Sequence, residues 1–305
     1  MDIEFAKFQG TGNDFVMIDG LATPVELTTA QVKALTDRHF GIGADGVIVV
    51  APPRTPGAAG YMNYINADGS LAQMCGNGTR CIAKYLADRG IATGDEFVID
   101  TLSGPKPVTV TRAEDGTVDT VRVGMGAPAF APDALPVAAA TDATTPEGDE
   151  YVSDLRIDSP WGTLRFTCVS MGNPHAVALL GPDNQLDPSA YLSEPSLENL
   201  DIDRVGHFFC THEVFPEGAN IEFGVPDADG VRMRVYERGC GETLACGTGA
   251  CAVAVAGALA GGPDAQTVRV PGGVLEIEWD RAGKNVYLQG PAREVFTGRV
   301  SVPNR

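Results

Sequence analysis

The chain has 305 residues, 44% of them hydrophobic and 20% charged, a composition typical of globular proteins with room for two domains. Its formal net charge of −18 makes nucleic acid and acidic membrane surfaces poor partners, and no apolar run reaches the about 20 residues that a transmembrane helix needs. The amino terminus shows no signal peptide, and the seven cysteines are irregularly spaced without a Cys-x-x-Cys pair. We therefore expect a cytoplasmic protein with mostly free thiols and no metal site.

In the first half, strands are predicted at residues 15–19, 47–51 and 61–66, the last ending at the turn 67–69. A capping box formed by Thr28 and Gln31 predicts a helix that runs to about His39. Apolar residues between Asn77 and Arg89 recur at helical spacing, and Gly90 follows as a helix stop. A proline-rich loop is expected at residues 52–56.

In the second half, the proline-rich residues 128–136 are the candidate linker, and the acidic residues 142–154 are expected to form a solvated loop. A buried helix is predicted at residues 250–259, which are mostly alanine and valine, with glycines 261 and 262 after it. The predicted strands of this half are residues 164–170, 221–225, 231–236, 274–279 and 286–289.

One arrangement of residues occurs in both halves. A Gly-Asn pair is followed by an asparagine and then by Cys-Gly-x-Gly at the start of a predicted helix. The two sets are Gly12-Asn13, Asn66 and Cys75-Gly76-Asn77-Gly78, and Gly172-Asn173, Asn220 and Cys246-Gly247-Thr248-Gly249. The interval from Asn to Cys is 62 residues in the first set and 73 in the second, so the repeat has no fixed period.

The repeat predicts an α+β fold with two pseudo-symmetric domains, each a curved mixed β-sheet or barrel around a central helix. We expect an amino-terminal domain at residues 1–120, to which a strand at about 290–305 returns, and a carboxy-terminal domain at residues 121–289. The active site is expected in the cleft between them.

The two cysteines suit inversion of a carbon that carries a proton. A helix amino terminus stabilises a thiolate, and the glycines that follow let a carboxylate approach the free N–H groups of the first turn. Two such units facing one another place two sulfurs on opposite faces of the adjoining α-carbon. Cys75 and Cys246 are therefore the candidate acid and base, with no cofactor. The other five cysteines are expected to be small core residues.

Together the motifs resemble the diaminopimelate epimerase family. The matching segments are residues 8–15, 38–46, 66–70, 74–81, 172–175, 216–220 and 236–249, in the family's order. The resemblance implies that the protein converts LL-diaminopimelate to the meso form, on the lysine and peptidoglycan route. It also implies the family's fold, a cofactor-free two-base mechanism and a homodimer.

The resemblance further assigns roles to individual residues. Cys75 and Cys246 are the two bases, and the backbone of Gly76, Asn77, Gly247 and Thr248 holds the reacting carboxylate. Asn13 lies near the reacting amino group, and Glu237 offers an acceptor to a substrate ammonium. The distal amino-acid end is held by Asn66, Asn173, Asn220 and Arg238, of which Arg238 can bind a carboxylate bidentately.

Two further positions carry hypotheses. His175 is expected to deprotonate or orient one thiol, together with Glu237, whereas the other histidines receive no role. Gly46 stands where some family members have glutamine, so a side-chain contact to the substrate is absent there. Which thiol is ionised at rest stays open, because coupled groups share their titration.

Several alternatives stay open. Proline and hydroxyproline epimerases typically have histidine after the first Cys-Gly and aspartate near the second, where this chain has Asn77 and Glu237-Arg238. A histidine racemase of related sequence remains a candidate. Isomerases of the phenazine-biosynthesis type are not expected to use two cysteines. A non-catalytic amino-acid-binding module or a thiol-redox protein would leave the paired thiols at helix starts unexplained.

Overall fold

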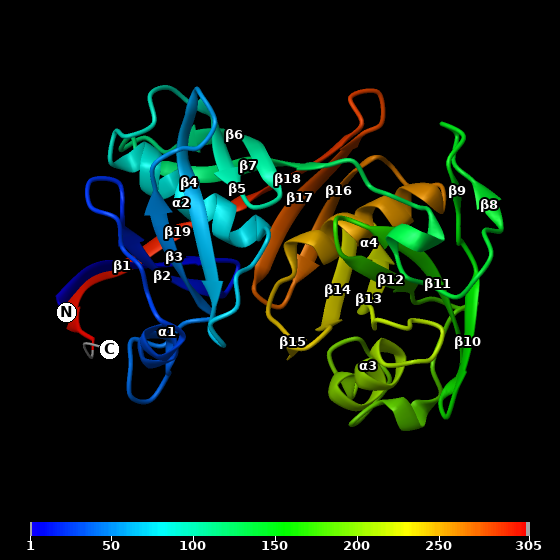
Figure 1. The fold of residues 1–305 in the computed structure, drawn as a ribbon. Coiled ribbons are helices and arrows are strands. Elements are labelled where there is room, and N and C mark those ends of the chain that lie inside the picture. Colours follow the sequence, from blue (N-terminus) through cyan, green and yellow to red (C-terminus); the bar gives the residue numbers. More distant parts are fainter. Residues whose placement is uncertain (1, 303–305) are drawn as a thin grey trace. The chain divides into compact units, whose positions relative to one another are not determined.

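The computed structural model describes residues 2–302, and its contacts divide the chain into two compact units. The first unit runs to Gly124 and includes the chain from Gln289 onwards, and the second spans Met125–Leu288. Figure 1 shows the elements of both units. None of the described helices is long and apolar enough to cross a membrane.

In the first unit, one sheet is built in the order β19, β1, β2, β3, β4, β5, β6, β7. These strands are β1 (Asp2–Gly10), β2 (Asn13–Asp19), β3 (Gly46–Ala51), β4 (Ala58–Asn66), β5 (Glu96–Thr101), β6 (Gly104–Arg112), β7 (Val118–Gly126) and β19 (Arg293–Ser301). Two helices belong to this unit, α1 (Thr29–Thr36) and α2 (Gly76–Asp88). Helix α2 packs against β1, β2, β3, β4, β6 and β19, so the sheet curves around it.

In the second unit, the sheet has the order β10, β11, β12, β13, β14, β16, β17, and β15 pairs with the end of β14. The strands are β10 (Leu155–Ser159), β11 (Gly162–Ser170), β12 (Pro174–Leu179), β13 (Asn220–Asp227), β14 (Gly230–Glu237), β15 (Gly241–Glu242), β16 (Ala265–Val270) and β17 (Gly273–Asp280). Strand β18 (Asn285–Pro291) follows and contains the boundary between the units at Leu288 and Gln289. The helices are α3 (Ile202–Cys210) and α4 (Gly247–Leu259), and α4 packs against six strands of the sheet.

The two units share one succession of elements. From β1 to β6 the strand pairs alternate antiparallel, parallel, antiparallel, parallel, antiparallel, and the same alternation runs from β11 to β17. In each unit the first parallel pair is connected through an outer helix, α1 or α3, and the second through the central helix, α2 or α4. The α+β fold with two pseudo-repeated domains is therefore confirmed.

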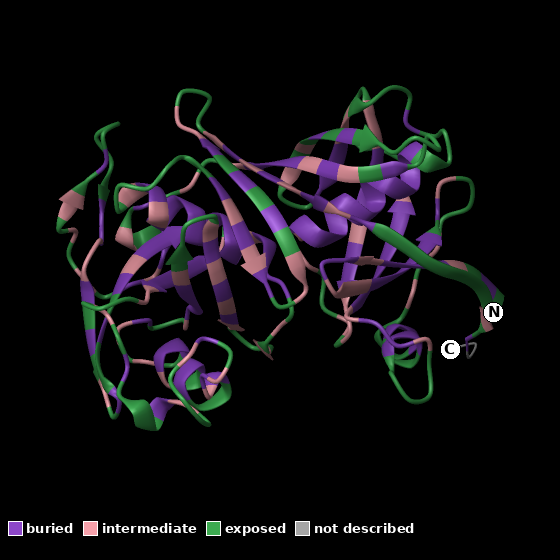
Figure 2. Cartoon of the chain, turned by 180° about the vertical axis from the view of Figure 1, so that it is seen from behind, coloured by how far each residue is buried: buried purple, intermediate pink, exposed green. Residues whose placement is uncertain are grey.

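The central helices differ from ordinary surface helices because they are buried on nearly all sides. In α2, every residue from Gly76 to Ala87 is buried, and α4 consists mainly of alanine, valine and glycine, whose small side chains let strands approach on every side. Figure 2 shows both as mostly buried. The outer faces of the sheets are covered differently. The apolar side of α1, at Val32 and Leu35, packs on the first sheet, and α3 packs on the second.

Four local predictions differ from the structure. Helix α1 has the predicted capping box but ends at Thr36, because the side chain of Asp37 accepts hydrogen bonds from the backbone of His39 and Phe40 and turns the chain. Helix α4 begins at Gly247, earlier than predicted. The acidic loop contains a hairpin of β8 (Ala143–Thr144) and β9 (Glu150–Tyr151), in which Tyr151 is buried.

The proline-rich stretch after β7 is also packed more closely than a free linker would be. It contains the 3-10 helix η1 (Pro132–Ala134), and both Phe130 and Leu135 are buried. A second 3-10 helix, η2 (Pro188–Ala190), precedes α3. Phe130 and Leu135 therefore anchor the stretch in the second unit, whereas Ala129, Ala131, Asp133 and Ala134 between and beside them are exposed.

Candidate active site

Cys75 is the N-cap residue of α2. Its backbone is extended, with φ −144° and ψ 116°, and its Sγ accepts a hydrogen bond from the backbone N–H of Gly78 at 3.4 Å. The thiol also lies 3.7 Å from the side-chain oxygen of Asn13, to which it can donate. This cysteine therefore has one donor that favours the thiolate and one acceptor that favours the thiol.

Asn13 is held in one orientation by its neighbours. Its Nδ2 donates to Asp45 Oδ2 at 2.7 Å, which leaves Oδ1 to face Cys75 and to accept from Asn77 Nδ2 at 3.4 Å. Asp45 in turn forms an ion pair with Arg38 at 2.7 Å. The predicted residues Asn13, Cys75 and Asn77 thus lie together, and Asp45 is a contributor that sequence analysis missed.

Replacing Asp45 by alanine should release Asn13 from this orientation. We expect kcat/KM for the substrate to fall about tenfold, because the hydrogen bond lost is one to a charged group, worth about 1.5–3 kcal/mol, and water can replace part of it. Steady-state kinetics would measure the change. Asp95→Ala is the matched control, since it removes an exposed ion pair with Arg112. Wild-type kinetics for Asp45→Ala would mean that Asn13 needs no such support.

Asn66 and Gly46 lie at the same end of the first sheet, opposite one another in the β3–β4 register. Asn66 Nδ2 donates to Ser70 Oγ at 3.0 Å, so its bonds hold the turn after β4. A Cβ on Gly46 would lie 2.5 Å from the ring of Tyr64 and 2.6 Å from the carbonyl oxygen of Ile65. Position 46 therefore has no space for a side chain, in agreement with the glycine found there.

Cys246 occupies the corresponding place in the second unit, as the N-cap of α4. Its Sγ accepts from the backbone N–H of Gly249 at 3.4 Å and lies 3.4 Å from Thr248 Oγ1. Burial, followed by the nearby carboxylates of Glu237 and Glu222, raises the pKa of Cys246 well above its ordinary value, while the two hydrogen bonds lower it. This thiol is thus protonated at neutral pH unless a cation or the loss of a neighbouring charge assists it.

His175 is completely buried and bonded through both ring nitrogens. Nδ1 lies 2.6 Å from Glu222 Oε1, and Nε2 lies 3.1 Å from Asn173 Oδ1. His175 and Glu237, which are expected to act together on one thiol, have different hydrogen-bond partners: His175 is bonded to Glu222, and Glu237 accepts from the hydroxyl of Thr243. Burial raises the pKa of Glu222, and the contact with His175 lowers it.

Asn220 and Arg238 are joined directly. Asn220 Oδ1 accepts from the backbone N–H of Arg238 at 2.8 Å, and its Nδ2 donates to the carbonyl of Pro174 at 3.1 Å. The guanidinium of Arg238 is exposed and donates to the carbonyl of Glu217 at 3.0 Å. Asn220 is therefore a buried support for Arg238, and Arg238 is the residue whose charge is accessible.

The backbone groups predicted to hold a carboxylate lie in the first turns of α2 and α4. Gly76 and Asn77 open one helix, and Gly247 and Thr248 open the other. The first N–H groups of an α-helix have no acceptor within the helix and carry its partial positive charge. Each thiol therefore stands beside backbone donors suited to an anion.

The strands of the two units show which residues of the repeated arrangement lie at equivalent positions. Asn66 ends β4 nine residues before Cys75, and the residue nine before Cys246 is Glu237, at the end of β14. Asn220 begins β13, where Gly46 begins β3. The prediction that Asn66 and Asn220 are equivalent is therefore wrong, although Asn13 and Asn173 both lie at the turn before the second strand.

The remaining cysteines divide into two groups. Cys81, Cys168, Cys210 and Cys251 are buried, and burial raises the pKa of both Cys81 and Cys168 to about 12, so these thiols are inert. Cys240 is exposed, which contradicts the expectation of a core residue, because it lies in the turn between two glycines with φ of 83° and 81°.

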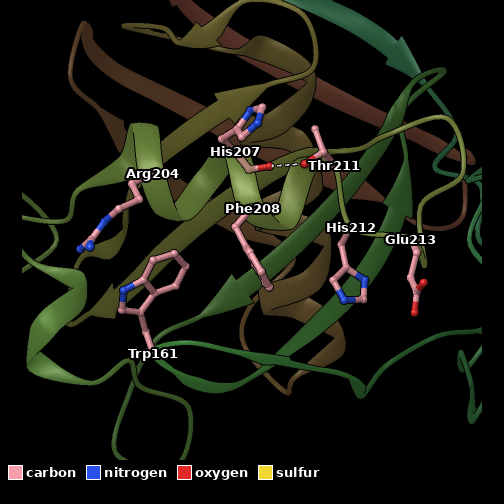
Figure 3. Close-up of a pocket in the computed structure, with 7 residues that line it drawn as sticks. All are labelled: Trp161, Arg204, His207, Phe208, Thr211, His212 and Glu213. Carbon is pink, nitrogen blue, oxygen red and sulfur yellow. Dashed lines mark hydrogen bonds between the residues drawn. The ribbon is translucent and has the colours of Figure 1, made fainter.

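A separate hollow of about 580 Å³ lies on the surface of the second unit along α3. Figure 3 shows its lining, which consists of Trp161, Arg204, His207, Phe208, Thr211, His212 and Glu213. It contains none of the predicted site residues, and Trp161 and Phe208 pack edge to face there at 5.7 Å. Within residues 2–302, no cluster of three or more His, Cys, Asp or Glu side chains could hold a metal ion.

Comparison with known proteins places the chain in a family. The family model described as diaminopimelate epimerase matches residues 5–131 and 167–295. A protein named diaminopimelate epimerase from Acaryochloris marina is 42% identical over 306 residues, covering 98% of each chain. One from Methanococcus maripaludis is 38% identical over 303 residues, covering 98% of this chain and 100% of its own.

Solved structures share the fold at lower identity. A probable proline racemase from Agrobacterium radiobacter has a TM-score of 0.65 at 19% identity, covering 99% of this chain and 93% of its own. A phenazine biosynthesis protein from Bacillus anthracis has a TM-score of 0.66 at 18% identity, covering 99% of this chain and all of its own. These likenesses concern the fold alone, whereas the match to the epimerases extends through the sequence. The chain belongs to the diaminopimelate epimerase family.

Proposed function

We propose that the protein is an isomerase that converts LL-2,6-diaminopimelate to the meso form without a cofactor, using Cys75 and Cys246 as acid and base in a cleft between the two units. The observation that carries the proposal is one arrangement found in both units, which we call a half-site. In each unit a cysteine caps the central helix, and its Sγ accepts an N–H of the first turn. Family membership supports the substrate.

The proposed chemistry is a proton removal on one face and a proton delivery on the other. One cysteine, as thiolate, takes the α-proton and becomes a thiol, and the opposite thiol gives its proton to the carbon and becomes a thiolate. The electron pair left on the carbon is delocalised into the carboxylate between these steps. Backbone N–H groups of Gly76, Asn77, Gly247 and Thr248 would stabilise that charge, which develops as the proton leaves.

The substrate's charges match the other residues proposed for the site. Diaminopimelate has two carboxylates and two ammonium groups, so the chain's net charge of −18 does not repel it. Asn13 would receive the reacting ammonium group, Glu237 would accept from an ammonium, and Arg238 would bind the distal carboxylate. Asn66 and Asn173 would complete the distal end, with Asn220 holding Arg238 in place.

The substrate assignment is tested by incubating the purified, reduced protein with LL-diaminopimelate and resolving the stereoisomers by chiral chromatography. We expect the meso form to appear without added cofactor. L-Histidine and L-proline are run alongside, because racemases for these substrates are the competing readings. Racemisation of either one, with diaminopimelate unchanged, would retain the two-thiol chemistry and reject the substrate.

We further propose a cytoplasmic homodimer that binds neither nucleic acid nor membranes. Strand β19 is exposed along almost its whole length (Figure 2), and it presents Val295 and Phe296 at 57% and 47% exposure. Exposed apolar side chains on a strand at the surface are typical of a surface that pairs with another chain.

Phe296→Glu should therefore shift the protein from dimer to monomer, because a charge in an apolar interface is left without a partner. Light scattering coupled to size-exclusion chromatography would measure the molar mass. Leu192→Glu is the matched control, since Leu192 is 77% exposed in the second unit. A wild type that is monomeric at every concentration, or a Phe296→Glu dimer as stable as the wild type, would contradict this surface.

A further inference from the structure

The thiol of Cys246 has a buried, ionisable pair beside it. Glu222, on β13, has no exposed surface, and its Oε1 lies 2.6 Å from His175 Nδ1 on the neighbouring strand β12. A Cβ on Gly249 would lie 2.7 Å from Glu222 Oε1 and 3.3 Å from Cys246 Sγ, so both atoms border the same glycine. The second carboxylate oxygen, Oε2, has no hydrogen-bond partner among residues 2–302.

In the first unit, the matching positions of the described strands hold no such pair. Phe15 and Ile48 occupy the strand positions that His175 and Glu222 occupy in the second unit. Phe15 and His175 each lie two residues after the asparagine of the preceding turn. Ile48 and Glu222 each lie two residues after the first residue of the strand that follows. A Cβ on Gly78, beside Cys75, would lie 3.1 Å from Ile48 Cδ1. The two thiols, which are otherwise held alike, therefore differ in whether their neighbour can carry a charge.

The charges around Glu222 come from several elements. Cys246 begins α4, Glu237 ends β14 and Cys210 lies in α3, and all three interact with the Glu222 charge unfavourably. The contact with His175 on β12 offsets it, because it lowers the pKa of Glu222. Both ring nitrogens of His175 face oxygen atoms, of Glu222 and Asn173, which a ring protonated on both nitrogens satisfies.

We propose that Glu222 is a positioning residue for Cys246: with His175 it forms a buried pair that holds one proton and so presents no net charge to the thiol while Cys246 cycles between thiol and thiolate. The proton is held by the pair throughout, whether on the ring or on the carboxyl group. If the pair loses it, a bare carboxylate stands beside Cys246 in a site of low dielectric, and the thiolate becomes costly to form.

This inference rests on the proposed function only in that Cys246 must ionise during turnover. Glu222→Gln is the direct test, because the amide keeps the shape and can accept from His175 but cannot acquire a charge. We expect the kcat/KM of the variant to differ from that of the wild type by a factor that depends on pH. The ratio of variant to wild type should then rise with alkaline pH, by at most about tenfold per pH unit, as the wild-type pair loses its proton.

The control is Glu213→Gln, an exposed carboxylate of the same unit, whose ratio to wild type should stay constant with pH. A constant ratio for Glu222→Gln would overturn the proposal, since a merely structural role would change the activity equally at every pH. An equal loss of activity at all pH values would also overturn the proposal, provided the variant has the melting temperature of the wild type.

A second measurement separates this inference from the substrate assignment and also covers a variant that does not fold. The rate at which iodoacetamide alkylates Cys246, followed by mass spectrometry of its peptide, reports the thiolate without any substrate. In the wild type we expect a pH curve broader than one ionisation, because the thiol and the pair titrate together. In Glu222→Gln a single ionisation at lower pH is expected. A single ionisation in the wild type would contradict the proposal, whatever the activity on diaminopimelate.

Discussion

Replacing either Cys75 or Cys246 by serine should lower kcat for epimerisation by about 10²–10⁴-fold, the contribution of a positioned general acid or base. A serine hydroxyl can accept the same helix N–H group, so the cap survives, but it is a far weaker acid than a thiol and does not ionise at neutral pH. Because the two groups act on one proton transfer sequence, the double variant should lose little more than either single variant.

Chiral chromatography of the products would measure these rates, and thermal melting would verify that the variants fold. Cys240→Ser is the matched control, since this cysteine is exposed in a turn and is expected to have no part in the reaction. A single variant of Cys75 or Cys246 that keeps most of its activity would refute the role proposed for that cysteine.

Replacing Arg80 by alanine should destabilise the first unit by about 3–5 kcal/mol, the range for truncating a large buried side chain to alanine. Arg80 lies in α2 with no exposed surface. Its Nε donates to the carbonyl of Pro291 at 3.1 Å, and its Nη2 donates to Thr11 Oγ1 at 3.0 Å. It thus connects the central helix to the β1–β2 turn and to the returning carboxy-terminal segment.

Urea unfolding followed by circular dichroism would measure this loss as a lower transition midpoint. Arg112→Ala is the control, because its ion pair with Asp95 is near the surface and should contribute no more than about 1 kcal/mol. An Arg80→Ala midpoint equal to that of the control would show that the buried guanidinium is not a structural connection.

Local signals in the sequence predicted the parts of the site that short segments form. The cysteine followed by glycines, and the capping box of α1, depend on residues three positions apart, so their geometry follows from adjacent sequence. The positions of Asn13 and Asn173 were likewise recognisable because each closes a hairpin turn with glycine.

Features that depend on distant partners were not predictable in the same way. Glu222 lies in a strand whose alternation would place it at the surface, but helix α4 covers that side of the strand, and a histidine 47 residues earlier pairs with the buried carboxyl group. Helix α3 contains Gly206, a poor helix former, where a Cβ would lie 2.5 Å from the side chain of Tyr236. Strand β1 has as its partner β19, almost the length of the chain away.

The difference between the two half-sites gives the repeated fold a functional asymmetry. Cys75 stands beside an amide oxygen and an apolar residue, whereas Cys246 stands beside a hydroxyl and two carboxylates, one of which is bonded to a histidine. The two proton-transfer directions should therefore respond differently to pH, even though the backbone presents both thiols in the same way.

The most direct test of the central claim is deuterium entry during a single conversion. The reduced protein is incubated with LL-diaminopimelate in D₂O, and the isomers are separated at low conversion and analysed by mass spectrometry. With two thiols on opposite faces, the newly formed meso isomer should carry one deuterium at the inverted carbon, while the remaining LL substrate stays unlabelled. Meso product that retains its original hydrogen, or the absence of both exchange and product, would contradict the two-thiol account.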